Sequence, residues 1–222
     1  MIFVIKKQNV MKKTIIISLL IFTALSCKAQ NIVPLNGAIQ ANNYLKDLDN
    51  VRDNFVGTWQ FIGGNQEFIL HIYKHDMNTS SYLGQTFWKD NIIGNYIYKE
   101  NGVEIINSHD FFSSLSNVNH TPFYGYTVNG TELEESLTTI FDYGKPYLNY
   151  DCETRYKEGN VIMEITNLNS GNPLVATFKI LPIPHTIRTS NPACNDTNDI
   201  SGFSIPTDML LTKISDTPPP LN

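Results

Sequence analysis

The chain has 222 residues, of which 41% are hydrophobic, 11% aromatic and 17% charged, and its formal net charge is −5. This length is typical of one domain, and the composition can bury a core, which excludes a disordered or collagen-like chain. The negative charge argues against a nucleic-acid-binding protein, because such proteins concentrate Lys and Arg to neutralise phosphates. Three cysteines are too few for a disulfide scaffold.

The N-terminal segment is typical of an export signal. Basic residues follow Met11, which is the expected start in place of Met1. The apolar stretch Ile15–Leu25 is too short to cross a hydrocarbon core of ~30 Å, but it has the length of a signal-peptide core. We therefore predict a signal peptide over residues 1–26. The charged residues that its removal takes away are all basic, so the mature chain is more acidic than the full one.

The residues Ala24-Leu25-Ser26-Cys27 resemble a bacterial lipobox, in which the Cys is acylated and becomes the new N-terminus. The usual lipobox has Leu where this chain has Ala24. The resemblance implies a lipoprotein attached through Cys27, and the polar residues that follow predict a tether over residues 27–37. No acidic run follows Cys27, which favours an outer-membrane position that faces the periplasm. The alternatives are cleavage before Gln30, which would give a soluble periplasmic or secreted protein, and an uncleaved anchor. A triacylated Cys would suffice for stable attachment, whereas a single acyl chain would not.

The other two cysteines are Cys152 and Cys194. An exported protein meets an oxidising compartment, so these residues are candidates for a disulfide, with two free buried thiols as the alternative. Neither has a Cys or His neighbour at ligand spacing, so we expect no metal site and no cofactor there.

One helix is expected before a run of strands. Apolar residues within Ala38–Asn54 recur at helical spacing, and from Phe55 onward the chain consists of short β-prone segments separated by Gly, Asn and Asp. Asn101-Gly102 is the clearest turn, since both residues readily take positive φ. The expected strands and turns are Phe55–Ile62, Gln66–His75, a hairpin over 91–108, hairpin tips at 128–131, 158–160 and 169–172, a long loop over 182–206, and a last strand Asp208–Ile214.

The elements together predict an all-β domain over residues 38–214, with a disordered Pro-rich tail over 215–222. Short strands in sequential order favour an antiparallel up-and-down meander, and a long antiparallel sheet tends to close and so remove its edges. We therefore expect an up-and-down β-barrel preceded by one short N-terminal helix, with a two-sheet β-sandwich as the alternative.

The residues Phe55-Val56-Gly57-Thr58-Trp59 resemble the G-x-W signature of lipocalins. The resemblance implies that Gly57 lets the chain bend at the closed end of the barrel and that Trp59 plugs this end. It also implies a basic side chain over the ring, for which Lys213 is the candidate. The alternative is that Trp59 is an ordinary core aromatic. The chain departs from lipocalins at Phe141-Asp142-Tyr143, where the usual Thr is missing, and in having no helix after the barrel.

A second resemblance covers most of the mature chain. The segments FVGTWQF, DNIIGNYIYKENGVEIINS and IPTDMLLTKI, together with the leader LSCKAQ, look like a family of exported or lipidated proteins of Flavobacteria (Bacteroidota) with a domain of unknown function. The resemblance implies an exported β domain of the cell envelope and brings no known activity.

No catalytic motif is present, so an enzyme is not expected. Glu67, His71 and His75 mimic a metal-binding pattern, but positions i and i+4 of a strand lie about 13 Å apart and cannot share one ion. His109 and Asp110 would point to opposite faces of a strand.

Aromatic residues crowd the middle third of the chain, and they are Tyr73, Tyr82, Phe87, Trp88, Tyr96, Tyr98, Phe111, Phe112, Phe123, Tyr124 and Tyr126. The first hypothesis is a cup in which some of them hold a small hydrophobic ligand. The second is a non-enzymatic envelope interaction or structural lipoprotein with a solid barrel and a protein partner. In both cases we expect a monomer.

Overall fold

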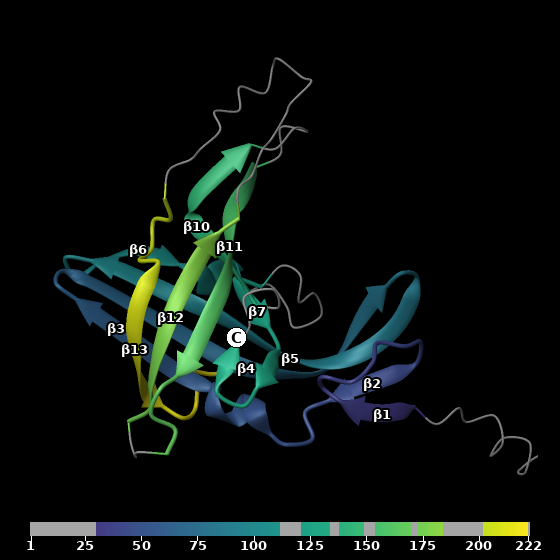
Figure 1. The fold of residues 1–222 in the computed structure, drawn as a ribbon. Helices are drawn as coiled ribbons and strands as arrows, with labels where there is room; N and C mark the ends of the chain where they lie inside the picture. The colour runs from purple at the N-terminus through teal and green to yellow at the C-terminus, as the bar shows by residue number, and fades with distance from the viewer. Residues whose placement is uncertain are drawn as a thin grey trace, which may run out of the picture. The chain divides into compact units, whose positions relative to one another are not determined.

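The computed structural model describes residues 30–111, 121–133, 138–148, 154–169, 173–183 and 202–221. It is nearly all β, with a closed eight-strand antiparallel barrel (Figure 1). The predicted barrel is thereby confirmed. The chain divides into a unit of residues 1–32 and a compact unit of residues 33–222, which contains the barrel.

Eight strands form the barrel. They are β3 (Gly57–Gly63), β4 (Gln66–Tyr82), β5 (Gln85–Glu100), β7 (Phe123–Gly125), β10 (Thr139–Leu148), β11 (Thr154–Ile165), β12 (Val175–Pro182) and β13 (Asp208–Ser215). Neighbouring strands follow the order β5-β4-β3-β13-β12-β11-β10-β7, and β7 pairs back with β5. This last pairing closes the sheet, so that no barrel strand is left as a free edge.

The remaining elements are short. They are β1 (Asn31–Pro34), β2 (Asn43–Lys46), β6 (Val103–Asn107), β8 (Thr127–Asn129), β9 (Glu132–Leu133) and the 3-10 helices η1 (Val51–Asn54) and η2 (Ser108–Phe111). Among the helices of the described part, none is long and apolar enough to span a bilayer.

Side-chain alternation places the core inside the barrel. On β4, Phe68, Leu70 and Ile72 are fully buried, whereas the residues between them are partly exposed. The aromatic rings of the core touch one another, with centroids 5.4 Å apart for Phe68 and Tyr96 and 5.9 Å apart for Phe68 and Phe178. Large aromatic side chains therefore pack against one another inside the barrel, at centroid distances that aromatic pairs prefer.

The Asn101-Gly102 turn between β5 and β6 has the predicted backbone, with φ of 53° and 75°. Positive φ at both positions defines the type I′ turn, whose twist matches that of the flanking strands. The prediction of a hairpin here is confirmed.

The predicted helix over Ala38–Asn54 is wrong, since the segment forms β2 followed by the single turn η1. Asn42 and Asn50 have left-handed φ of 65° and 53°, which a right-handed helix does not allow. Two further interactions take the place of helical hydrogen bonds. β2 pairs with β5, and the Asp47 carboxylate accepts the backbone N–H groups of Val51 and Arg52.

The predicted hairpin tip at 158–160 is also wrong, because β11 runs through it without a break. Gly159 pairs with Ile140 of β10 on one side and Pro182 of β12 on the other. A Cβ at this position would lie 2.7 Å from Cγ2 of Ile180 and 2.8 Å from Cζ of Phe203. The glycine thus serves close packing inside a strand, which a turn-based interpretation of the sequence misses.

Some predictions fall outside the described residues. These are the signal peptide, Cys27, Cys152, Cys194 and most of the 182–206 loop. In the tail, Leu221 packs against Tyr73 and Ile93 on the outer face of the sheet.

The β4–β5 hairpin is longer than the barrel. β3 pairs with β4 only as far as Ile72, and β7 pairs with β5 only from Ile92. We call the part of the hairpin beyond these residues, Tyr73–Asn91, the arm (Figure 1). A bulge interrupts its pairing between His75 and Asn78. β2 joins the arm through a parallel pairing with β5.

Candidate functional site

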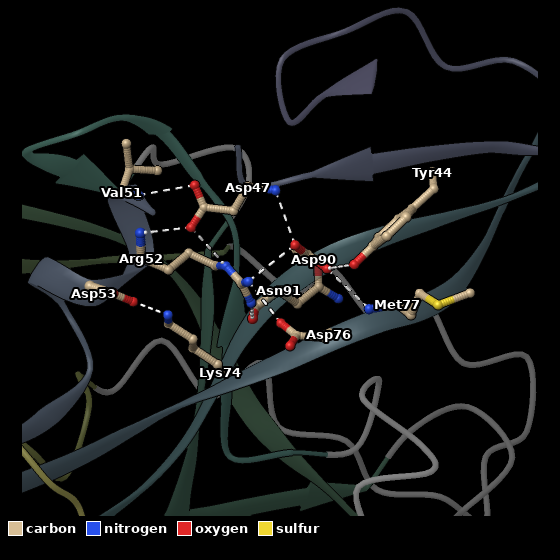
Figure 2. A network of polar contacts seen from close by, with 10 residues as sticks. All are labelled: Tyr44, Asp47, Val51, Arg52, Asp53, Lys74, Asp76, Met77, Asp90 and Asn91. Atoms are coloured by element: carbon tan, nitrogen blue, oxygen red, sulfur yellow. Dashed lines mark hydrogen bonds and ion pairs between the residues drawn. The ribbon is translucent and has the colours of Figure 1, made fainter. Parts of the chain in front are cut away.

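The densest polar cluster in the described residues joins η1 to the root of the arm. Arg52 of η1 is only 4% exposed, and its guanidinium contacts three carboxylates. Nε lies 3.1 Å from Asp47, while Nη2 lies 2.7 Å from Asp76 and 3.1 Å from Asp90. Nη1 donates to the Asn91 carbonyl at 2.9 Å. Figure 2 shows the Arg52 side chain among these groups. We call this cluster the Arg52 network.

The two buried carboxylates of the Arg52 network also bind the backbone. Asp90 accepts the N–H of Asp47 at 3.0 Å and the N–H of Met77 at 3.1 Å. It further accepts the Tyr44 hydroxyl at 2.6 Å. These bonds tie β2, η1 and both strands of the arm to one buried group. Because each charge is hydrogen-bonded, the cluster satisfies the condition under which charges are tolerated in a protein interior.

Burial and the adjacent Asp90 carboxylate raise the pKa of Tyr44 above its usual value. The Tyr44 hydroxyl therefore remains protonated and acts as a hydrogen-bond donor to Asp90. The side chains of Asp47 and Asp90 are each only 2% exposed, whereas that of Asp76 is 65% exposed. The Arg52 network is suited to a structural role. The carboxylates of Asp47 and Asp90 already accept hydrogen bonds from donors of the chain, and they are buried away from any substrate.

A second group of residues occupies one end of the barrel. Gly57 has φ of 133°, and a Cβ there would lie 2.2 Å from the Ser215 carbonyl and 2.8 Å from Cε of Lys213. Trp59 is fully buried, and its Nε1 donates to the Phe55 carbonyl at 2.7 Å. The Lys213 Nζ lies 5.7 Å from the centroid of the Trp59 ring, within the range of a cation–π contact.

Lys213 also connects the end of the barrel to η1. Its Nζ donates to the Asn54 carbonyl at 3.3 Å and pairs with Asp216 at 3.1 Å. The three residues singled out from the sequence, Gly57, Trp59 and Lys213, thus lie together. Absence of a side chain at Gly57 leaves the space that Lys213 and the following strand residues occupy.

Two histidines lie close together outside the barrel. The Thr58 Oγ1 and the His71 Nδ1 are 3.1 Å apart, and the Asn95 amide lies 3.2 Å from Nδ1 of His109. Burial and then the nearby His109 lower the pKa of His71.

His109 lies in η2 and not on a strand, so the strand-based geometry assumed for it is wrong. His75 and Glu67 lie on β4 with His71, as expected.

Within the described part of the chain, no group of three or more His, Cys, Asp or Glu residues is arranged to hold a metal ion. The Arg52 network brings three aspartates together, but the guanidinium occupies the position between them. Sequence reasoning missed this network. The one available signal was a single Arg among aspartates in the segment DLDNVRDN, which lies within the segment predicted to be helical.

The fold and these contacts define an antiparallel β-barrel protein whose N-terminal segment is held to the arm by a buried ion-pair network. A family of unknown function, DUF6705, matches residues 11–214, and the chain belongs to this family. The expected kinship with a domain of unknown function is thus confirmed. No curated protein and no solved structure matches the chain significantly.

Proposed function

We propose that the protein is a non-enzymatic lipoprotein of the cell envelope whose solid barrel is a scaffold for interactions on its outer surface. In this proposal the signal peptide is removed before Cys27, and the lipidated Cys27 holds the domain on the periplasmic face of the outer membrane. The protein acts as a monomer without a cofactor.

The observation that carries the proposal is the packing of the barrel interior. Trp59, Tyr96, Phe68, Phe123 and Phe178 are all fully buried and come from different strands around the barrel. A ligand-binding cup needs a cavity of about 300–1,000 Å³ lined by such side chains. Here the rings face one another at contact distance. The packing therefore supports the solid barrel over a cup for a hydrophobic ligand.

Native mass spectrometry of the protein purified from membranes tests the solid barrel. The expected result is the mass of the lipidated chain alone. A variant with a smaller core side chain, Phe178→Ala, is the matched positive control, because it opens space where an apolar molecule such as benzene could enter. Recovery of the unsubstituted protein with a stoichiometric hydrophobic molecule would refute the solid barrel.

The lipid anchor has its own test. Mass analysis of the N-terminal peptide should find a diacylglycerol thioether on Cys27, and the protein should fractionate with membranes. Cys27→Ser should abolish the modification. A mature chain that begins at Gln30 and is recovered in the soluble fraction would overturn this part of the proposal.

A further inference from the structure

The end of the arm carries exposed apolar side chains where folding does not require them. The turn between β4 and β5 consists of Leu83 and Gly84, with φ of 49° and 76°. This is the type I′ geometry, for which Asn-Gly is the preferred pair and Leu is unfavourable, because a Cβ disfavours left-handed backbone. Leu83 is 85% exposed and its neighbour Tyr82 is 57% exposed. Neither backbone preference nor burial in the domain explains a leucine here.

The same part of the arm lacks charge. Residues 77–88 contain no Asp, Glu, Lys or Arg, although the whole chain carries a net charge of −5. A charge-free tip with an exposed leucine and tyrosine is suited to the boundary of a lipid bilayer, where an apolar side chain enters the hydrocarbon and a tyrosine stays at the headgroups.

The course of the N-terminal segment indicates that the membrane lies near this tip. The Asn42 N–H donates to the Thr86 carbonyl at 2.9 Å, three residues beyond Leu83. Upstream of it, Val33 and Leu35 belong to a cluster with Phe87 of the arm. Five residues lie between Cys27 and Val33, so the two Cα atoms are six residue steps and at most about 20 Å apart. A lipid on Cys27 would therefore keep the outer part of the arm close to the bilayer surface.

We propose that the tip of the arm inserts Leu83 and Tyr82 into the membrane to which Cys27 is anchored, so that the lipid and the arm together fix the orientation of the barrel. This inference rests on the proposed lipid anchor. Insertion relies on apolar contact and not on charge. It therefore occurs on zwitterionic lipid and is insensitive to salt.

Thiol labelling of the full lipidated protein in phosphatidylcholine vesicles tests the insertion. Leu83→Cys and the control Ile62→Cys are exposed to a membrane-impermeant maleimide, with the unsubstituted protein as the blank for native cysteines. Ile62 is 69% exposed on β3 of the barrel, so without a membrane it is the less accessible of the two. Insertion should make the thiol at residue 83 react about tenfold more slowly than the control, or slower still. Equal rates, or a faster reaction at residue 83, would overturn the proposal.

Two further readouts separate the alternatives. Protection of the thiol at residue 83 in native membranes but not in pure lipid vesicles would identify a protein partner and overturn lipid insertion. A chain that lacks the lipid and stays in the soluble fraction would overturn the anchor and the insertion together, whereas an anchored chain with a reactive residue 83 would overturn the insertion alone. Leu83→Asn should leave the thermal midpoint unchanged or raise it, because Asn favours left-handed φ. A lower midpoint would assign Leu83 a role in folding and contradict the inference.

Discussion

Replacement of Arg52 by Met should be among the most destabilising single substitutions outside the barrel core. The guanidinium is the only cation that the structure places against the buried carboxylates of Asp47 and Asp90 in the described residues. Removing one partner of a buried ion pair costs about 3–5 kcal/mol, because the remaining charge is left without compensation. Methionine fills a similar volume, so the loss reports the charge and its hydrogen bonds more than a cavity.

The assay is equilibrium unfolding in urea followed by tryptophan fluorescence, since Trp59 is fully buried and becomes exposed on unfolding. With an m-value of about 2 kcal/mol per molar urea, the expected loss lowers the unfolding midpoint by about 1.5–2.5 M. Lys74→Met is the matched control. Lys74 pairs with Asp53 at the surface, where both side chains are substantially exposed, and such a pair contributes less than about 1 kcal/mol.

Hydrogen exchange shows where the Arg52→Met variant loses stability. The backbone amides at positions 51 and 52 donate to the Asp47 carboxylate, and in the variant they should be the first to lose protection from exchange. If Arg52→Met costs no more than the Lys74→Met control, the buried network does not hold the N-terminal segment to the arm, and the reasoning is refuted.

Three more substitutions test other parts of the structure. Gly57→Ala should cost about 3 kcal/mol or more in urea unfolding, against about 1 kcal/mol for Gly64→Ala, whose Cβ would meet open space. Equal costs would refute the steric argument. Tyr44→Phe should cost about 1.5–3 kcal/mol, because it removes a hydrogen bond to a buried carboxylate, whereas exposed Tyr82→Phe should cost nothing measurable. The lowered pKa of His71 means that its unfolded state binds the proton more readily, so stability should fall as pH drops below 6.5. His71→Gln should flatten this decline in thermal midpoint, and an unchanged slope would contradict it.

Local residue preferences predict some of the turns in this fold and not others. Asn101-Gly102 determines its own turn, because the conformational preference of these two residues and the alternation of the flanking strands agree. The Leu83-Gly84 turn has the same geometry but carries Leu where this turn type prefers Asn, so residue preferences alone do not predict it. Gly159 presents the opposite case, because a glycine typical of a turn lies within a strand where neighbouring side chains leave no room for a Cβ.

What the sequence by itself determined is the class of fold. Period-two alternation and short spacing between turns favour an antiparallel sheet with one buried face, and the need to remove the sheet edges favours closure into a barrel over a two-sheet sandwich. The proximity of Lys213 to Trp59 was also expected, but from a family resemblance and not from periodicity.

Only the tertiary structure decided the course of the N-terminal segment. Helical periodicity in residues 38–54 is real, but a helix there would have to leave Arg52 and two aspartates without their partners. Arg52 meets Asp90 across 38 residues of chain and Asp76 across 24. Contacts at such separations exist only once the arm has formed, and together with the β2–β5 pairing they outweigh a helix propensity of a few tenths of a kcal/mol per residue.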